Sequence, residues 1–144
     1  MERQFLSAGN TRNLNRLYAL VLNAEPSNLI CKNNLAATSL LLKANLTRAH
    51  ELAAEVYVAA GTNAILATTY AYSRFLQGKP AEGLGVFARM QPAELEQPPV
   101  ALYQAVLLWS TGKTNEAVHA LDIASRARDT FLPEEKLLLK SCGR

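Results

Sequence analysis

The chain has 144 residues, of which 49% are hydrophobic and 19% are charged, so it can bury the core of one domain without disulfide support. Its formal net charge is +3, but basic and acidic residues are interspersed and no basic run occurs, which argues against a nucleic-acid partner. No apolar stretch approaches the length of a membrane-spanning helix, so we expect no membrane contact by this segment.

Hydrophobic periodicity and turn residues predict eight helices, in chain order 11–24, 28–43, 46–60, 63–77, 80–91, 98–111, 114–129 and 133–141. Prolines fall at or near several of these starts, where a missing N–H costs nothing: Pro26, Pro80, Pro98, Pro99 and Pro133. Gly78 and Gly112 each separate two predicted helices, where a left-handed C-terminal cap favours a residue without Cβ. The sequence therefore predicts an all-α fold.

One pattern recurs with a period of 34 residues, the separation of Gly78 and Gly112. Small residues recur in two registers, at Ala71 and Ala105 and at Ala49, Gly83 and Ala117. Such residues let the two helices of a hairpin cross closely, because a larger side chain would push the backbones apart. The same step carries Phe87 to Leu121, which would fill the space beside the crossing.

This order of small residues, turn glycine and large apolar residue resembles the tetratricopeptide repeat (TPR) family. The matching residues are Ala105, Gly112, Ala117, Leu121 and Ala124 in the last unit, and Ala71, Gly78, Gly83, Phe87 and Met90 in the unit before. The segment "NNLAATSLLLKANLTRAHELA" is similar to a variant repeat with one extra turn residue, Asn45. The resemblance implies a right-handed superhelical solenoid of antiparallel helix hairpins, with turns similar to those of bacterial members.

The resemblance covers residues 1–144 as a single TPR-like domain of about 3.5 to 4 repeats. The approximate repeats are 1–25, 27–61, 62–95 and 96–129, followed by a capping helix at 132–141. Because "RQFLSAGN" would be only the final turns of a first helix, we expect the C-terminal portion of a longer repeat protein. In the capping helix, Leu137, Leu138 and Leu139 are expected to cover the last hairpin, with Glu134 and Glu135 in water.

In this family the first helix of each hairpin lines the concave face, and the resemblance implies a partner-binding groove there. Its residues would be Asn33, Asn34, Thr68, Tyr72, Phe75, Leu102, Val106 and Trp109, with Ala37, Leu40 and Ile65 beside them. Tyr72, Leu102 and Val106 replace the polar and basic residues with which the family grips a peptide carboxylate. We therefore expect the groove to take an apolar or aromatic peptide or helix. The alternative is that the same stripe packs against other repeats or a second copy.

Arg74 is the one charged residue in the apolar stretch "YAYSRFL". It is either a charged anchor for a partner's carboxylate or a member of a structural ion pair. The favoured interpretation is the ion pair, with Glu55 or Glu51 on the neighbouring hairpin, because a charge at a packed position needs a nearby partner.

Residues that could carry catalysis or bind a metal are sparse. His50 and His119 have no second histidine, cysteine or carboxylate at the spacing of a metal motif, so we expect no metal and no cofactor. Cys31 has no recognisable histidine partner, and Cys31 and Cys142 are expected to be free thiols in a reducing compartment, with a cytoplasmic location favoured. The sequence indicates that the chain is not an enzyme.

The function that follows is a protein–protein interaction scaffold that binds a peptide or helix of a partner in an apolar and aromatic concave groove. The alternative is a structural end-cap or self-association segment of a longer TPR protein, with no separate ligand. The partner is therefore a protein or peptide, or another copy of the chain. The identity of the partner does not follow from the sequence.

Overall fold

A computed structural model describes the protein over residues 1–144, with ten α-helices, one short 3-10 helix and no strand. The expected all-α fold is confirmed. The elements are α1 (Glu2–Ser7), α2 (Thr11–Ala24), α3 (Leu29–Leu42), α4 (Leu46–Ala60), α5 (Ala64–Leu76), α6 (Pro80–Ala88), α7 (Pro92–Leu95), α8 (Pro98–Ser110), α9 (Thr114–Arg126), η1 (Arg128–Thr130) and α10 (Pro133–Ser141). None of the helices combines the length and the hydrophobicity that spanning a membrane requires.

Local capping chemistry sets where the helices begin and end. Asparagine side chains accept backbone N–H bonds at the starts of α2, α3 and α5, from Asn10, Asn28 and Asn63. Proline occupies the first turn of α6, α7, α8 and α10. Gly78 and Gly112 follow α5 and α8 with φ of +76° and +81°, which is the left-handed conformation predicted for these turns.

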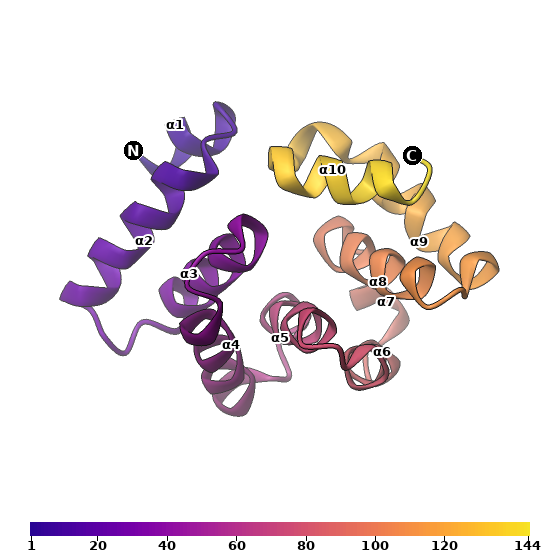
Figure 1. Cartoon of the computed structure of the whole chain (residues 1–144), viewed down its shortest axis with the longest axis horizontal. Helices are drawn as coiled ribbons and strands as arrows, with labels where there is room; N and C mark the ends of the chain where they lie inside the picture. The colour runs from indigo at the N-terminus through magenta and orange to yellow at the C-terminus, as the bar shows by residue number, and fades with distance from the viewer.

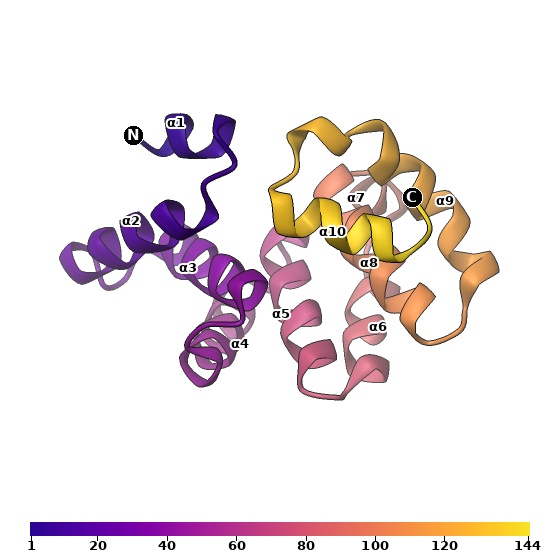
Figure 2. The same ribbon diagram turned by 45° about the horizontal axis from the view of Figure 1, so that its top comes forward.

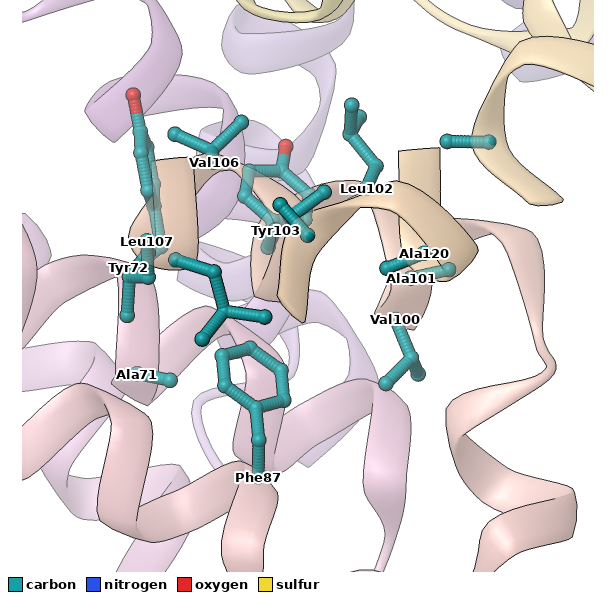
Figure 3. Packing of buried hydrophobic residues seen from close by; sticks show 14 of the residues in the cluster. Ala71, Tyr72, Phe87, Val100, Ala101, Leu102, Tyr103, Val106, Leu107 and Ala120 are labelled. Atoms are coloured by element: carbon teal, nitrogen blue, oxygen red, sulfur yellow. The ribbon is translucent and has the colours of Figure 1, made fainter. Parts of the chain in front are cut away.

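The close helix crossing predicted from the small residues is present between α5 and α6. A Cβ atom on Gly83 would lie 2.6 Å from Leu107 Cδ2 and 2.7 Å from the carbonyl oxygen of Ala71. Only glycine fits this position without a shift of the neighbouring backbone. The side chain of Phe87 is buried in the same cluster and points from α6 toward side chains of α8 (Figure 3).

The helices pack as successive neighbours and together form an open arc (Figure 1). Helices α3, α5 and α8 lie along the inner side of the arc, where α3 contacts α5 and α5 contacts α8. Helices α4, α6 and α9 pack behind them on the outer side. The side lined by α3, α5 and α8 is called the inner face below.

The link between α6 and α8 differs from the sequence prediction. The sequence predicts a helix through residue 91, whereas α6 ends at Ala88 and the four-residue α7 follows. Pro92 explains the break, because its ring cannot continue a helix and restricts the residue before it. The backbone N–H of Gln91 donates to Glu94 Oε2 at 2.8 Å, which starts α7 as a separate turn.

The C-terminal helix α10 lies across the inner face and contacts α8, α9 and α3 (Figure 2). At its start, Thr11 Oγ1 at the beginning of α2 donates to Glu134 Oε2 at 2.5 Å. The expectation that three consecutive leucines cover the last hairpin is wrong in part. Leu139 is fully buried and Leu138 half-buried, but Leu137 is 65% exposed, because adjacent helical residues point about 100° apart.

Candidate binding site

A cavity of about 160 Å³ lies on the inner face, closed on one side by α10. We call it the inner-face cavity. Its walls are Asn33, Asn34, Ala37, Leu40, Ile65, Thr68, Thr69, Tyr72, Pro99, Tyr103 and Glu135. The structure thus brings together the candidate residues of α3 and α5 except Phe75, which lies outside the cavity. It adds Thr69, Pro99, Tyr103 and Glu135, which were not expected in the site.

The candidate groove residues of α8 do not form an open wall. Leu102 and Val106 are 0% and 3% exposed, in the same hydrophobic cluster as Leu139 and Cys142 of the C-terminal segment. Trp109 is half-buried against that cluster and outside the cavity. The expectation of an exposed groove along α8 is therefore wrong, because α10 lies over this part of the inner face.

Aromatic rings form one side of the cavity. Tyr72 on α5 and Tyr103 on α8 have ring centroids 4.9 Å apart at an interplanar angle of 56°, and both hydroxyls point to the same side of the cluster in Figure 3. Phe75 supports Tyr72 from behind, with a centroid distance of 6.1 Å. Burial raises the pKa of Tyr72 to about 12, so its phenol is neutral near pH 7.

Glu135 supplies the only formal charge in the cavity wall. Its Oε2 accepts a hydrogen bond of 2.7 Å from the hydroxyl of Tyr103, and its Oε1 accepts one of 3.0 Å from the backbone N–H of Leu132. Burial raises the pKa of the Glu135 carboxyl, and the two hydrogen bonds oppose that shift. The expectation that Glu135 is solvated is wrong, because it faces α8 instead of water.

Asn33 and Thr68 place buried polar groups in the α3 and α5 walls. Asn33 is 4% exposed, and its Nδ2 donates to Asn34 Oδ1 at 3.3 Å while its own Oδ1 has no partner. The hydroxyl of Thr68 donates to the Ala64 carbonyl at 2.8 Å, which leaves its oxygen lone pairs free to accept. A buried acceptor without a partner costs about 1–3 kcal/mol, so Asn33 Oδ1 destabilises the fold locally.

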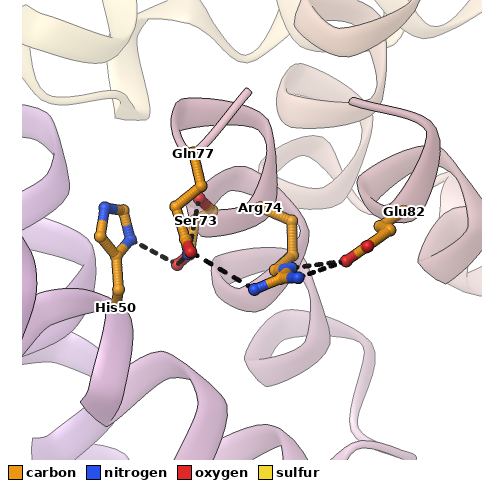
Figure 4. Close-up of polar contacts among 5 residues, drawn as sticks. All are labelled: His50, Ser73, Arg74, Gln77 and Glu82. Atoms are coloured by element: carbon orange, nitrogen blue, oxygen red, sulfur yellow. Dashed lines mark hydrogen bonds and ion pairs between the residues drawn. The ribbon is translucent and has the colours of Figure 1, made fainter. Parts of the chain in front are cut away.

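Arg74 lies outside this cavity, in an ion pair that differs from the predicted one. Its Nε and Nη2 are 2.7 and 2.6 Å from Glu82 Oε2 on α6 (Figure 4). The predicted partner Glu55 pairs instead with Lys32 and Arg48. Arg74 stands in the last turn of α5 and Glu82 in the first turn of α6, so the short turn between the helices brings these two charges together.

A second polar cluster joins α4 to α5 through His50, Ser73 and Gln77 (Figure 4). His50 Nδ1 is 2.7 Å from Ser73 Oγ, to which Gln77 Nε2 donates at 3.1 Å. Burial, and then the charge of Arg74, lower the pKa of His50. Ser73 is fully buried, so its hydroxyl cannot reach a substrate, and the cluster instead connects two helices.

The remaining residues that could carry chemistry are dispersed. His119 is exposed, with its Nε2 2.7 Å from Glu96 Oε1. Cys31 and Cys142 are buried free thiols whose pKa values are raised by burial. No three His, Cys, Asp or Glu side chains converge in a geometry that could hold a metal ion. The inner-face cavity is therefore the candidate site, because it lies at residues of α3 and α5 that the sequence singles out.

Comparisons of the chain with protein-family models, with curated proteins and with solved structures find no match. The function of the chain is therefore inferred from its residues and their geometry.

Proposed function

We propose that the chain is a TPR-like module, a right-handed solenoid of helix hairpins, that binds a peptide or helix of a partner protein on its inner face. The 34-residue repeat supports this proposal, because Gly78 and Gly112 take equivalent places in successive hairpins, and so do Gly83, at the close crossing, and Ala117. In such an array the first helices of the hairpins, here α3, α5 and α8, form one continuous surface.

The position of α10 is the single observation that carries the proposal. This helix has one buried edge at Leu139 and one solvated edge, and it lies along the inner face of its own chain. The inner face therefore has the shape and the apolar character to accept a short amphipathic helix. Beside α3 and α5, α10 closes the inner face on one side only, through Glu135, and the cavity remains there.

The part of the inner face that α10 covers favours a second candidate function. In this function, the chain is the structural end-cap of a longer helical repeat protein. Leu102 and Val106 are buried together with Leu139, as expected if α10 ends the solenoid and shields its last hairpin. In that case α10 and the α8 residues act as a structural cap. The cavity at α3 and α5 then has no role in binding a protein.

Selection from a random peptide display library tests the binding function, because the library samples many candidate ligands at once. The wild-type chain should enrich a family of related sequences that then bind as synthetic peptides. Ile65→Arg places a charged side chain at the mouth of the cavity and should abolish that binding, because Ile65 is a half-exposed wall residue.

Val58→Arg is the matched control, since Val58 is 88% exposed on α4 and belongs to a different surface. This variant should bind the selected peptides as the wild type does. Failure to enrich any related peptides, or equal loss of binding in both variants, would favour the structural cap instead.

A further inference from the structure

Helix α10 lies on the inner face (Figure 2) and contacts it through one line of side chains. Glu135 accepts the hydrogen bond of the Tyr103 hydroxyl, Leu139 is 0% exposed and Cys142 is 2% exposed. Residues at i, i+4 and i+7 lie on one side of a helix, so these three residues, which we call the α10 stripe, face the body of the protein together. On the opposite side of α10, Leu137 is 65% exposed.

The contacts that hold α10 in place all involve side chains. No backbone–backbone hydrogen bond joins residues 132–144 to the preceding chain. At the start of α10, Glu134 accepts a hydrogen bond from Thr11, and beyond its end Arg144 Nη2 lies 3.1 Å from Asp122 Oδ1. A helix from another molecule can make contacts of the same kind on this surface.

The residues before α10 have the geometry of a hinge. Phe131 is buried in the main hydrophobic cluster and fixes the chain there. The backbones of Phe131 and Leu132 are both extended, and Pro133 then begins α10. Because a hinge needs only a few residues at the end of an element, a change at these two positions would move α10 as one body while the core stays packed.

We propose that α10 is an exchangeable occupant of the α8 part of the inner face, and that a helix of the partner protein replaces it through the same stripe. That helix carries a carboxylate, a leucine four residues later and a small apolar side chain three residues after the leucine. The inference rests on the proposed function, because it names the kind of helix that the inner face binds.

The α8 surface explains this requirement. When α10 leaves, the hydroxyl of Tyr103 loses its acceptor, and a new occupant without a carboxylate would bury that donor unpaired. The side chains of Leu102 and Val106 need apolar cover, which the leucine supplies. Partner binding at α8 and closure by α10 are then mutually exclusive.

Cys142 reports on the position of α10, because it is buried while the helix is in place. Cys31→Ser leaves Cys142 as the only thiol of the full chain and keeps a donor for the Tyr18 carbonyl. In this variant a dilute thiol reagent should modify Cys142 about tenfold or more faster than the whole protein unfolds, as followed by circular dichroism.

Two tyrosine variants in this background test the contact that seats the helix. Tyr103→Phe should raise the labelling rate about tenfold, because the docked Glu135 carboxylate loses its donor. Tyr57→Phe is the matched control and should leave the rate unchanged, since Tyr57 stacks on Tyr70 away from α10.

A synthetic peptide of residues 131–144, with alanine in place of Cys142, tests the exchange. At about millimolar concentration it competes with the tethered helix and should raise the labelling rate of Cys142 in the chain. The same peptide with Leu137→Lys should act equally, because Leu137 is exposed on α10. The peptide with Leu139→Lys should have no effect, because Leu139 is the buried member of the stripe.

The outcomes are distinct. If Cys142 is labelled only as the protein unfolds, or if the Leu137→Lys and Leu139→Lys peptides act alike, the exchange is refuted. Display-selected peptides that still bind at Ile65 in that case leave the proposed function standing. If the α10 peptide exchanges but the display library enriches no related peptides, the exchange stands and the proposed binding of a partner protein fails.

Discussion

The hydroxyl of Tyr103 on α8 donates a hydrogen bond of 2.7 Å to Oε2 of Glu135 on α10, between residues 32 positions apart in the chain. This contact connects the C-terminal helix to the inner face and at the same time sets one wall of the inner-face cavity. Both partners are largely removed from water. The low dielectric constant around them strengthens the hydrogen bond.

Tyr103→Phe should destabilise the protein by about 2 kcal/mol, because a buried carboxylate loses its donor while the ring packing is kept. Urea unfolding followed by circular dichroism measures the change. Tyr57→Phe is the control, since Tyr57 stacks on Tyr70 at 4.1 Å through its ring and lies on a different surface. Equal stability of the two variants would show that the bond to Glu135 contributes nothing to the fold.

Replacement of two glycines of α6 by alanine should change the stability of the protein in opposite directions. Gly83→Ala forces a methyl group into Leu107 and the Ala71 carbonyl and should cost about 1–3 kcal/mol. Gly85→Ala meets nothing within 4 Å and should stabilise the protein by about 0.5–1 kcal/mol, since alanine is the better helix former. Thermal unfolding of both variants distinguishes the signs, and a stabilising Gly83→Ala would disprove the close crossing of α5 and α6.

The raised pKa of Glu135 predicts a specific pH dependence of stability. The unfolded carboxyl titrates near its usual 4.5, so between that value and the raised pKa the folded state binds more protons than the unfolded state. This residue therefore adds stability as the pH falls from neutral toward 4.5. The groups that face it are Tyr72 from α5, Tyr103 from α8 and the neighbouring Glu134.

Comparison of wild type with Glu135→Gln isolates this effect. The free energy of unfolding of the wild type should rise relative to the variant as the pH is lowered through the window above 4.5. His50, whose lowered pKa has the opposite effect, is common to both proteins and cancels in the difference. A difference that stays constant with pH would mean that Glu135 titrates as a solvated carboxyl does.

Asn33→Leu should stabilise the protein by about 1 kcal/mol, although it removes a polar side chain from the cavity wall. The Oδ1 atom has no partner in the chain, so its replacement by an apolar group of similar shape relieves a desolvation cost. Thermal unfolding without ligand measures this change, with Asn34→Leu as the control at a half-exposed neighbour. A loss of stability would show that Asn33 serves the fold.

The helices could be predicted from the sequence because their ends are encoded locally. Pro80, Pro98 and Pro133 mark starts and Gly78 and Gly112 mark ends, and each acts within its own turn. The close crossing at α5 and α6 was also predictable, since the 34-residue period places small residues opposite one another. By contrast α7 was missed, because a single turn has no hydrophobic periodicity.

The part of the site that was missed depends on the path of the chain after the last hairpin. The repeat pattern gives no position for α10, so neither the burial of Leu102 and Val106 nor the contact between Tyr103 and Glu135 could be inferred from it. The sequence from Glu134 to Leu139 indicates a helix, but it does not indicate which side of that helix is buried. Similarly, Arg74 had several acidic residues within reach, and only the geometry of the α5–α6 turn selects Glu82.

The measurement that tests the central claim most directly is NMR mapping of a display-selected peptide on the isotopically labelled chain. Binding at the inner face predicts the largest amide shifts at Asn33, Asn34, Thr68 and Tyr72, with little change on the outer helices α4, α6 and α9. Shifts confined to those outer helices would contradict the proposal that the inner face is the binding surface of this protein.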